Sequence, residues 1–184
     1  LPFITGTGDA LLEINPENPQ PKPNVGSEFS GVAMGEDGKP YCVDKSMNMS
    51  SEDVEKTLMG LMPLIQERLK FLTEAAEMVH FMFTEPAVPP VEQIVPKKLD
   101  QAKTKEVLES AIGFIEKLPS IDHEAAEQLA KDTAEKLGVK LGDFMMPIRM
   151  AVTGSRVSPP LIGSILVLGA EKSVERVKKA IATL

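Results

Sequence analysis

Two arginines in an apolar segment carry the clearest chemical signal in this chain of 184 residues. Residues 146–169 read MPIRMAVTGSRVSPPLIGSILVLG, which places Arg149 and Arg156 around a Thr-Gly-Ser turn and a Pro-Pro helix start. A buried or half-buried arginine is costly unless it has a partner. Arg149 can therefore form an internal salt bridge with a carboxylate, or present its planar donors to an RNA base or phosphate. The residues alone leave both interpretations open.

Arg68 poses the same question. Its neighbours on a helix surface are Leu64, Phe71, Leu72 and Ala75, all of them apolar, because residues three and four apart lie side by side on a helix. We therefore expect Arg68 to border the apolar stripe instead of pointing fully into water.

Residue types that catalyse reactions or bind metals are sparse and scattered. Cys42, His80 and His123 are too few and too far apart in the sequence for a zinc site. GTGDA at 6–10 has the first two glycines of a phosphate-binding loop but lacks the third, so a turn is the default interpretation. No arrangement of a nucleophile with a base stands out. We expect a binding module with no catalytic residue, no metal and no cofactor of its own.

Amphipathic helices must position the arginines. Apolar residues from Val54 to Val79 recur at spacings of three and four, which is the pattern of one helix face. Ser50 stands three residues before Asp53, an arrangement that resembles a capping box and predicts the helix start. Pro63 lacks a backbone donor, so we expect a kink or a break there.

Further helices are marked by their start and stop residues. After a Pro-rich connection from Thr84 to Pro96, the pattern predicts five more. The first spans about 97–118, and the second is capped by Asp122 and ended by Gly138. The third runs from near Asp143 to Thr153–Gly154, and the fourth begins at Pro159–Pro160 and ends at Gly169. The fifth runs from about Glu171 to the end of the chain. The predicted fold class is all-α, a compact cage or bundle of about six helices over residues 51–184.

Residues 1–50 differ in composition from the rest. They hold NPENPQPKPN and then GSEFSGVAMGEDGKP, which are rich in Pro, Asn, Gly and small polar residues. Such segments bury little surface, so we expect a mostly irregular N-terminal arm or an insertion, with YCV at 41–43 as a short strand.

The bulk composition is that of a soluble globular protein, with 42% hydrophobic and 26% charged residues. Without an 18-residue apolar run or a secretion signal, we expect no membrane partner and a cytoplasmic location. The chain does not begin with Met, so we interpret it as a fragment or a processed product. The net charge of −7 argues against a general nucleic-acid or DNA binder. Residues 144–184, however, hold six basic and two acidic residues, so this end of the chain can meet RNA.

Two stretches carry a resemblance to a known family. Residues 137–181, LGVKLGDFMMPIRMAVTGSRVSPPLIGSILVLGAEKSVERVKKAI, resemble the C-terminal end of bacterial glutamyl-tRNA synthetases, which reads Pro-Leu-Arg, then Thr-Gly, then a Pro-x-Leu helix. Residues 61–83, LMPLIQERLKFLTEAAEMVHFMF, look like the family's first helix in this domain. LPFI at 1–4 is similar to the family's entry into the domain, but residues 5–50 are much longer than the family's connection.

The resemblance implies a role in reading the anticodon for four residues. Arg68 matches the arginine that reads the third anticodon base in synthetases restricted to glutamate tRNA. Arg149 matches the arginine of the Pro-Leu-Arg motif, which lies against the anticodon loop. Ser158 and Leu161 match a threonine and a leucine that contact the middle base, and serine keeps the hydroxyl. Anticodon bases are single-stranded, so their edges are open to such side chains.

The resemblance also implies the partner and the parent reaction. We expect a monomer that binds the anticodon loop of glutamate tRNA, within a class I synthetase that ligates glutamate to tRNA with ATP and magnesium. The catalytic half of that enzyme would lie outside this chain. Two alternatives stay open: a relaxed synthetase that charges both glutamate and glutamine tRNAs, and a helical protein-interaction module derived from this domain.

Overall fold

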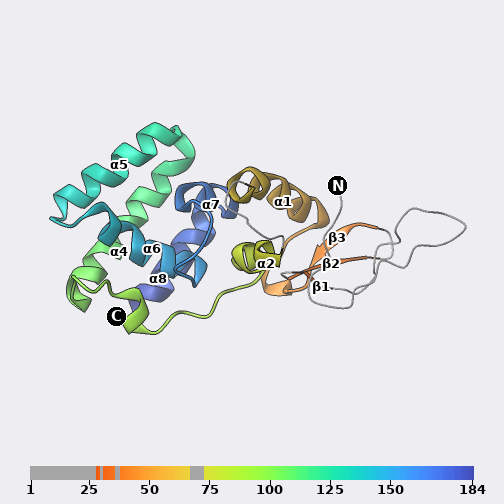
Figure 1. Cartoon of the computed structure of the whole chain (residues 1–184), viewed down its shortest axis with the longest axis horizontal. Coiled ribbons are helices and arrows are strands. Elements are labelled where there is room, and N and C mark those ends of the chain that lie inside the picture. Colours follow the sequence, from red (N-terminus) through yellow and green to blue (C-terminus); the bar gives the residue numbers. More distant parts are fainter. Residues whose placement is uncertain (1–27, 30, 36–37, 67–72) are drawn as a thin grey trace, which may run out of the picture. The chain divides into compact units, whose positions relative to one another are not determined.

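The computed structural model describes residues 28–29, 31–35, 38–66 and 73–184 (Figure 1). Arg68, LPFI at 1–4 and GTGDA at 6–10 lie outside the described residues. Eight α-helices and one small sheet make up the described part, which confirms the predicted all-α class. The contacts divide the chain into an N-terminal unit, Leu1–Glu85, and a C-terminal unit, Pro86–Leu184. This division falls later in the chain than the boundary near residue 50 that the composition predicts.

A three-stranded antiparallel sheet lies where the sequence predicts a mostly irregular arm. Its strands are β1 (Glu28–Phe29), β2 (Val32–Met34) and β3 (Pro40–Cys42), in that order. Gly31 joins the first two with a φ of +87°, and a Cβ there would come within 3.1 Å of the Phe83 Cβ. Only glycine fits both the conformation and the space, so tertiary contact as well as local sequence fixes this hairpin.

Two α-helices belong to the described part of the N-terminal unit. They are α1 (Ser51–Ile65), which packs on β3, and α2 (Thr73–Val79), which is followed by a 3-10 turn at His80–Met82. The predicted capping box at Ser50 is present: the Asp53 N–H donates to the Ser50 hydroxyl (3.2 Å), and the Ser50 N–H donates to the Asp53 carboxylate (3.0 Å). The helix runs through Pro63 and ends at Ile65, so the break predicted at the proline is not found at that residue. Residues 67–72, which follow, lie outside the described residues.

The C-terminal unit contains the remaining helices. The five predicted ones are found close to their predicted bounds, and a single-turn helix, α3, was not predicted because the Pro-rich segment around it is read as a connection. The bounds are α3 (Val91–Ile94), α4 (Gln101–Lys117), α5 (His123–Lys136), α6 (Leu141–Thr153), α7 (Leu161–Leu168) and α8 (Ala170–Thr183).

The core of this unit lies between α4, α6 and α8, with α5 along α4 and α6 (Figure 1). Phe114 on α4 and Phe144 on α6 meet edge to face, with ring centroids 5.7 Å apart. Ile115, Ile148 and Val177 are fully buried around them. Burial of these apolar side chains is the main stabilisation of the unit.

The last turn of α6 ends inside this core and needs partners for its carbonyls. The Arg176 side chain on α8 is only 2% exposed, and its Nη1 donates to the Val152 carbonyl at 2.8 Å. Gly154 closes the helix with a φ of +70°, and its N–H donates to the Met150 carbonyl at 3.0 Å. A cation at the carbonyl end of a helix is also favoured by the helix dipole.

We predict that Arg176→Met destabilises the C-terminal unit. Methionine keeps much of the volume but leaves the Val152 carbonyl buried without this donor, at a cost of about 1–3 kcal/mol. Denaturant unfolding followed by helical circular dichroism measures the loss. The matched control is Lys178→Met, an exposed position on the same helix, for which we expect a change under about 0.5 kcal/mol. Equal stability of the two variants would refute a structural role for Arg176.

A second prediction concerns the pH dependence of α1. Hydrogen bonds from the Ser50 hydroxyl and the Ser50 N–H lower the pKa of Asp53. A lowered folded-state pKa stabilises the helix above the ordinary aspartate pKa of 3.8, and this stabilisation is lost as the pH falls below that value. Asp53→Asn should therefore speed amide hydrogen exchange in α1 at neutral pH, and the difference from wild type should shrink in acid. Glu55→Gln, on the same exposed helix surface, controls for the loss of one charge. A difference that stays constant with pH would contradict the expectation.

Candidate functional site

Arg149 lies half-buried on α6, and the structure gives it defined internal partners. Its Nη1 donates to the Ser158 hydroxyl, to the Pro159 carbonyl at 3.0 Å and to the Ser158 carbonyl at 3.4 Å. Ser158 is itself 4% exposed, and its hydroxyl donates to the Pro159 carbonyl at 3.1 Å. The guanidinium therefore connects α6 to the segment that leads into α7. These partners are hydroxyl and carbonyl oxygens, a third possibility beside the carboxylate and the RNA that the sequence suggests.

The turn between α6 and α7 is fixed by its own hydrogen bonds. The Thr153 hydroxyl donates to the Arg149 carbonyl at 2.9 Å and accepts from the Ser155 N–H at 3.2 Å. The Ser155 hydroxyl then accepts from the Val157 N–H at 3.2 Å. A Cβ on Gly154 would come within 3.0 Å of the Pro86 Cβ, so the turn is also packed closely from outside. Such short side-chain-to-backbone bonds hold a turn in one conformation.

Leu161 begins α7 and lies in the core. It is 3% exposed and belongs to the same apolar cluster as Ile148 and Ile165. The structure therefore brings Arg149 and Ser158 into direct contact. Leu161 follows Ser158 by three residues in the sequence, and its side chain is buried in the core. Arg68 lies outside the described residues, so its role stays a prediction.

Arg176 and Thr153 support this site, although neither was predicted as a site residue. Arg176 had only a weak signal, because its neighbours at helical spacing include the buried Ser173 and Ala180 but also Lys172 and Lys179. The wholly apolar neighbours that drew attention to Arg68 are missing around it. Thr153 had no comparable signal, since its role depends on how the chain turns after α6.

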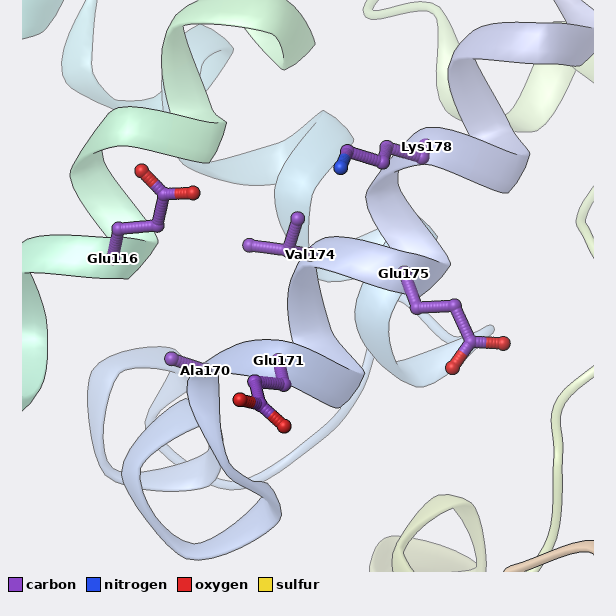
Figure 2. Close-up of a pocket in the computed structure, with 6 residues that line it drawn as sticks. All are labelled: Glu116, Ala170, Glu171, Val174, Glu175 and Lys178. Carbon is purple, nitrogen blue, oxygen red and sulfur yellow. The ribbon is translucent and has the colours of Figure 1, made fainter.

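A separate hollow lies between the end of α4 and the start of α8 (Figure 2). Figure 2 shows Lys178 pointing into it from α8 and Glu116 facing it from α4. Glu175 points away and pairs with Lys179 (2.8 Å) and Lys172 (3.5 Å), which hold the pKa of its carboxyl below the ordinary range. Carboxylates dominate the lining, so the hollow is unsuited to a phosphate.

The metal-ligating residue types are scattered in the part of the chain that the structure describes. No group of three or more His, Cys, Asp or Glu side chains there is placed to hold a metal ion. None of the described helices combines the length and the apolar character needed to cross a bilayer.

Comparison with known proteins shows that Arg149 lies in a region shared with a protein family. Residues 36–181 match the family model described as the anticodon binding domain. A glutamate–tRNA ligase from Treponema denticola is 52% identical over 132 residues, which cover 72% of this chain and 26% of that protein. The glutamate–tRNA ligase of Treponema pallidum strain Nichols is 44% identical over 138 residues, which cover 75% of this chain and 26% of the relative. The chain thus spans about a quarter of the length of these relatives.

A solved structure shares the fold. The crystal structure of a glutamate tRNA ligase from Elizabethkingia meningosepticum in complex with its amino acid matches with a TM-score of 0.55 and 24% identity. The match covers 76% of this chain and 27% of that one. The family match extends over α1 to α8, including the turn held by Arg149 and Arg176. The chain therefore belongs to the anticodon-binding domain family.

Proposed function

We propose that this chain binds and reads the anticodon loop of glutamate tRNA as part of a glutamyl-tRNA synthetase. The names of the relatives at 52% and 44% identity support glutamate as the amino acid of the parent enzyme. The parent reaction is the ATP-dependent ligation of glutamate to tRNA, with magnesium, and its catalytic residues belong to a part of the synthetase not contained in this chain. In this proposal the chain itself contributes recognition and no bond-making step.

The observation that carries the proposal is the Arg149 guanidinium, held at the partly exposed edge of α6 by Ser158 and Pro159. A guanidinium is a rigid, donor-only group that matches phosphates and base acceptors. Because it is already oriented by the turn, little side-chain entropy remains to be lost when RNA binds. Ser158 and Leu161, at 4% and 3% exposure, form the wall behind it. Their contact with the middle base stays a prediction from the family resemblance.

Glutamate specificity comes from Arg68 in this proposal. Glutamate and glutamine anticodons share the middle U and differ in the third base, which is C or G. Cytosine offers acceptors on its pairing edge, and guanine offers donors there. A donor-only guanidinium therefore favours cytosine.

We predict that Arg149→Gln weakens binding of glutamate tRNA by this chain. Loss of a charged hydrogen bond amounts to about 1.5–3 kcal/mol, or roughly tenfold to a hundredfold in the dissociation constant. Fluorescence anisotropy with labelled glutamate tRNA at several salt concentrations gives the affinity and its salt slope. The matched control is Lys131→Gln on α5, which removes one positive charge from an exposed position.

Circular dichroism of the same variants separates recognition from folding. We expect Arg149→Gln to keep its helices, because glutamine retains an amide donor that can reach the buried oxygens of Ser158 and Pro159. If wild type shows no salt-dependent tRNA binding and Arg149→Gln unfolds, Arg149 is structural. The alternative of a helical protein-interaction module would then be favoured.

Arg68→Gln tests the specificity. Glutamine can donate or accept, so it tolerates cytosine and guanine alike. A specific base contact is worth about 1–3 kcal/mol, so the preference for glutamate tRNA over glutamine tRNA should narrow by roughly tenfold to a hundredfold. The ratio of dissociation constants for the two tRNAs, in wild type and variant, measures it. An unchanged ratio in a folded variant would mean that Arg68 does not read the third base, and a ratio near one in wild type would favour the relaxed synthetase.

A further inference from the structure

Arg156 differs from the other arginines that the structure describes. Arg149 and Arg176 are both bonded to groups inside the C-terminal unit. Arg156 is exposed, and among the described residues no hydrogen bond or ion pair engages its side chain. The next residue, Val157, is 72% exposed, although valine is usually buried. The turn between α6 and α7 thus presents a free cation beside an apolar side chain.

The backbone that carries these two side chains is held on both sides. Before the turn, Arg176 bonds the Val152 carbonyl at 2.8 Å. After it, Arg149 bonds the Pro159 carbonyl at 3.0 Å. Within it, the Ser155 hydroxyl accepts from the Val157 N–H. Arg156 and Val157 are therefore exposed on a fixed support, and binding through them would not require the loop to be ordered first.

Their place in the chain sets them next to the Arg149 site. Val157 directly precedes Ser158, whose hydroxyl Arg149 holds, and successive Cα atoms are about 3.8 Å apart. A ligand that reaches the Arg149 guanidinium therefore passes close to both side chains. Single-stranded RNA alternates phosphates with ribose and base surfaces, which match a cation and an apolar group in turn.

We propose that Arg156 and Val157 form a second contact with tRNA, beside Arg149. Arg156 binds a backbone phosphate of the anticodon loop, and Val157 packs against the ribose or the face of a neighbouring nucleotide. This inference rests on the proposed function, because it takes the anticodon loop as the ligand. It adds two residues to those that the family resemblance indicates, one that acts through charge and one through apolar contact.

The test uses two single variants of the full chain, Arg156→Gln and Val157→Ser. The affinity of each for glutamate tRNA is measured at several salt concentrations, from low to moderate. Arg156→Gln should weaken binding and reduce the slope of log affinity against log salt by about 1, as expected for one phosphate contact. Val157→Ser should weaken binding by about fivefold with an unchanged slope, because it removes apolar surface and no charge. Arg156→Lys keeps the charge and should keep the slope.

Two controls match these variants. Lys131→Gln on α5 removes an exposed positive charge, and Leu141→Ser removes an exposed apolar side chain at the opposite end of α6. Both should bind tRNA as wild type does. Circular dichroism should show the same helix content for every variant, since exposed substitutions change stability by only about 0.5 kcal/mol.

The outcomes separate this inference from the proposed function. If wild type binds tRNA and Arg156→Gln and Val157→Ser bind equally well with the same slope, the second contact is wrong and the proposed function stands. An Arg156→Gln loss without a change of slope also overturns the phosphate contact. If wild type does not bind tRNA at any salt concentration, the proposed function fails and this inference fails with it.

Discussion

The structure of the C-terminal unit depends on hydrogen bonds to the last backbone carbonyls of α6, which lie inside the core. A helix leaves its last carbonyls without partners in the helix, and a buried carbonyl without a donor is costly. Arg176 meets this need from α8, at 2.8 Å from the Val152 carbonyl and with 2% of its surface exposed. Its permanent charge also suits the negative end of the helix dipole. The local cap at Gly154 ends α6, and a residue that follows more than twenty positions later stabilises that end.

Arg149 has the corresponding role on the other side of the turn. It holds the Ser158 hydroxyl and the Pro159 carbonyl, so the path of the chain into α7 is fixed from α6. Between these two anchors Gly154 takes a φ of +70°, which glycine accepts without strain. The three arginines of this region therefore differ by environment: one is buried, one is half-buried, and Arg156 is exposed. The two enclosed arginines set the geometry in which the exposed one is presented.

Local signals in the sequence were enough for most of the helices. Ser50 and Asp122 cap helix starts, and Gly154 and Gly169 end helices, because each acts through the backbone next to it. The sheet of residues 28–42 was missed except for its last strand, since strands of two or three residues are too short to show alternation. Its hairpin depends on contact between Gly31 and Phe83, far apart in the sequence.

The candidate site was predictable only where local sequence carries the signal, and not where residues from different helices meet. Arg149, Ser158 and Leu161 follow from the resemblance, and the apolar setting of Arg149 indicates that it needs a partner. That the partner is Ser158 does not follow from helical spacing, because the chain turns between them. The burial of Leu161 likewise depends on how α7 packs. Such contacts between elements are decided by tertiary structure.

Charge distribution gives this end of the chain a further property. Residues 144–184 hold six of the 20 basic residues and two of the 27 acidic ones, although the whole chain carries −7. An acidic body repels phosphates over a Debye length of about 8–10 Å at physiological salt, whereas a basic region attracts them at the same range. Under the proposed function, RNA that approaches the chain would be attracted more strongly by residues 144–184 than by the rest of the sequence. Long-range charge would select this end of the chain, and the fixed turn would then offer Arg149 and Arg156 at short range. Selectivity for a single stretch of RNA thus needs no overall positive charge, only a few cations held in place on a protein that is otherwise acidic.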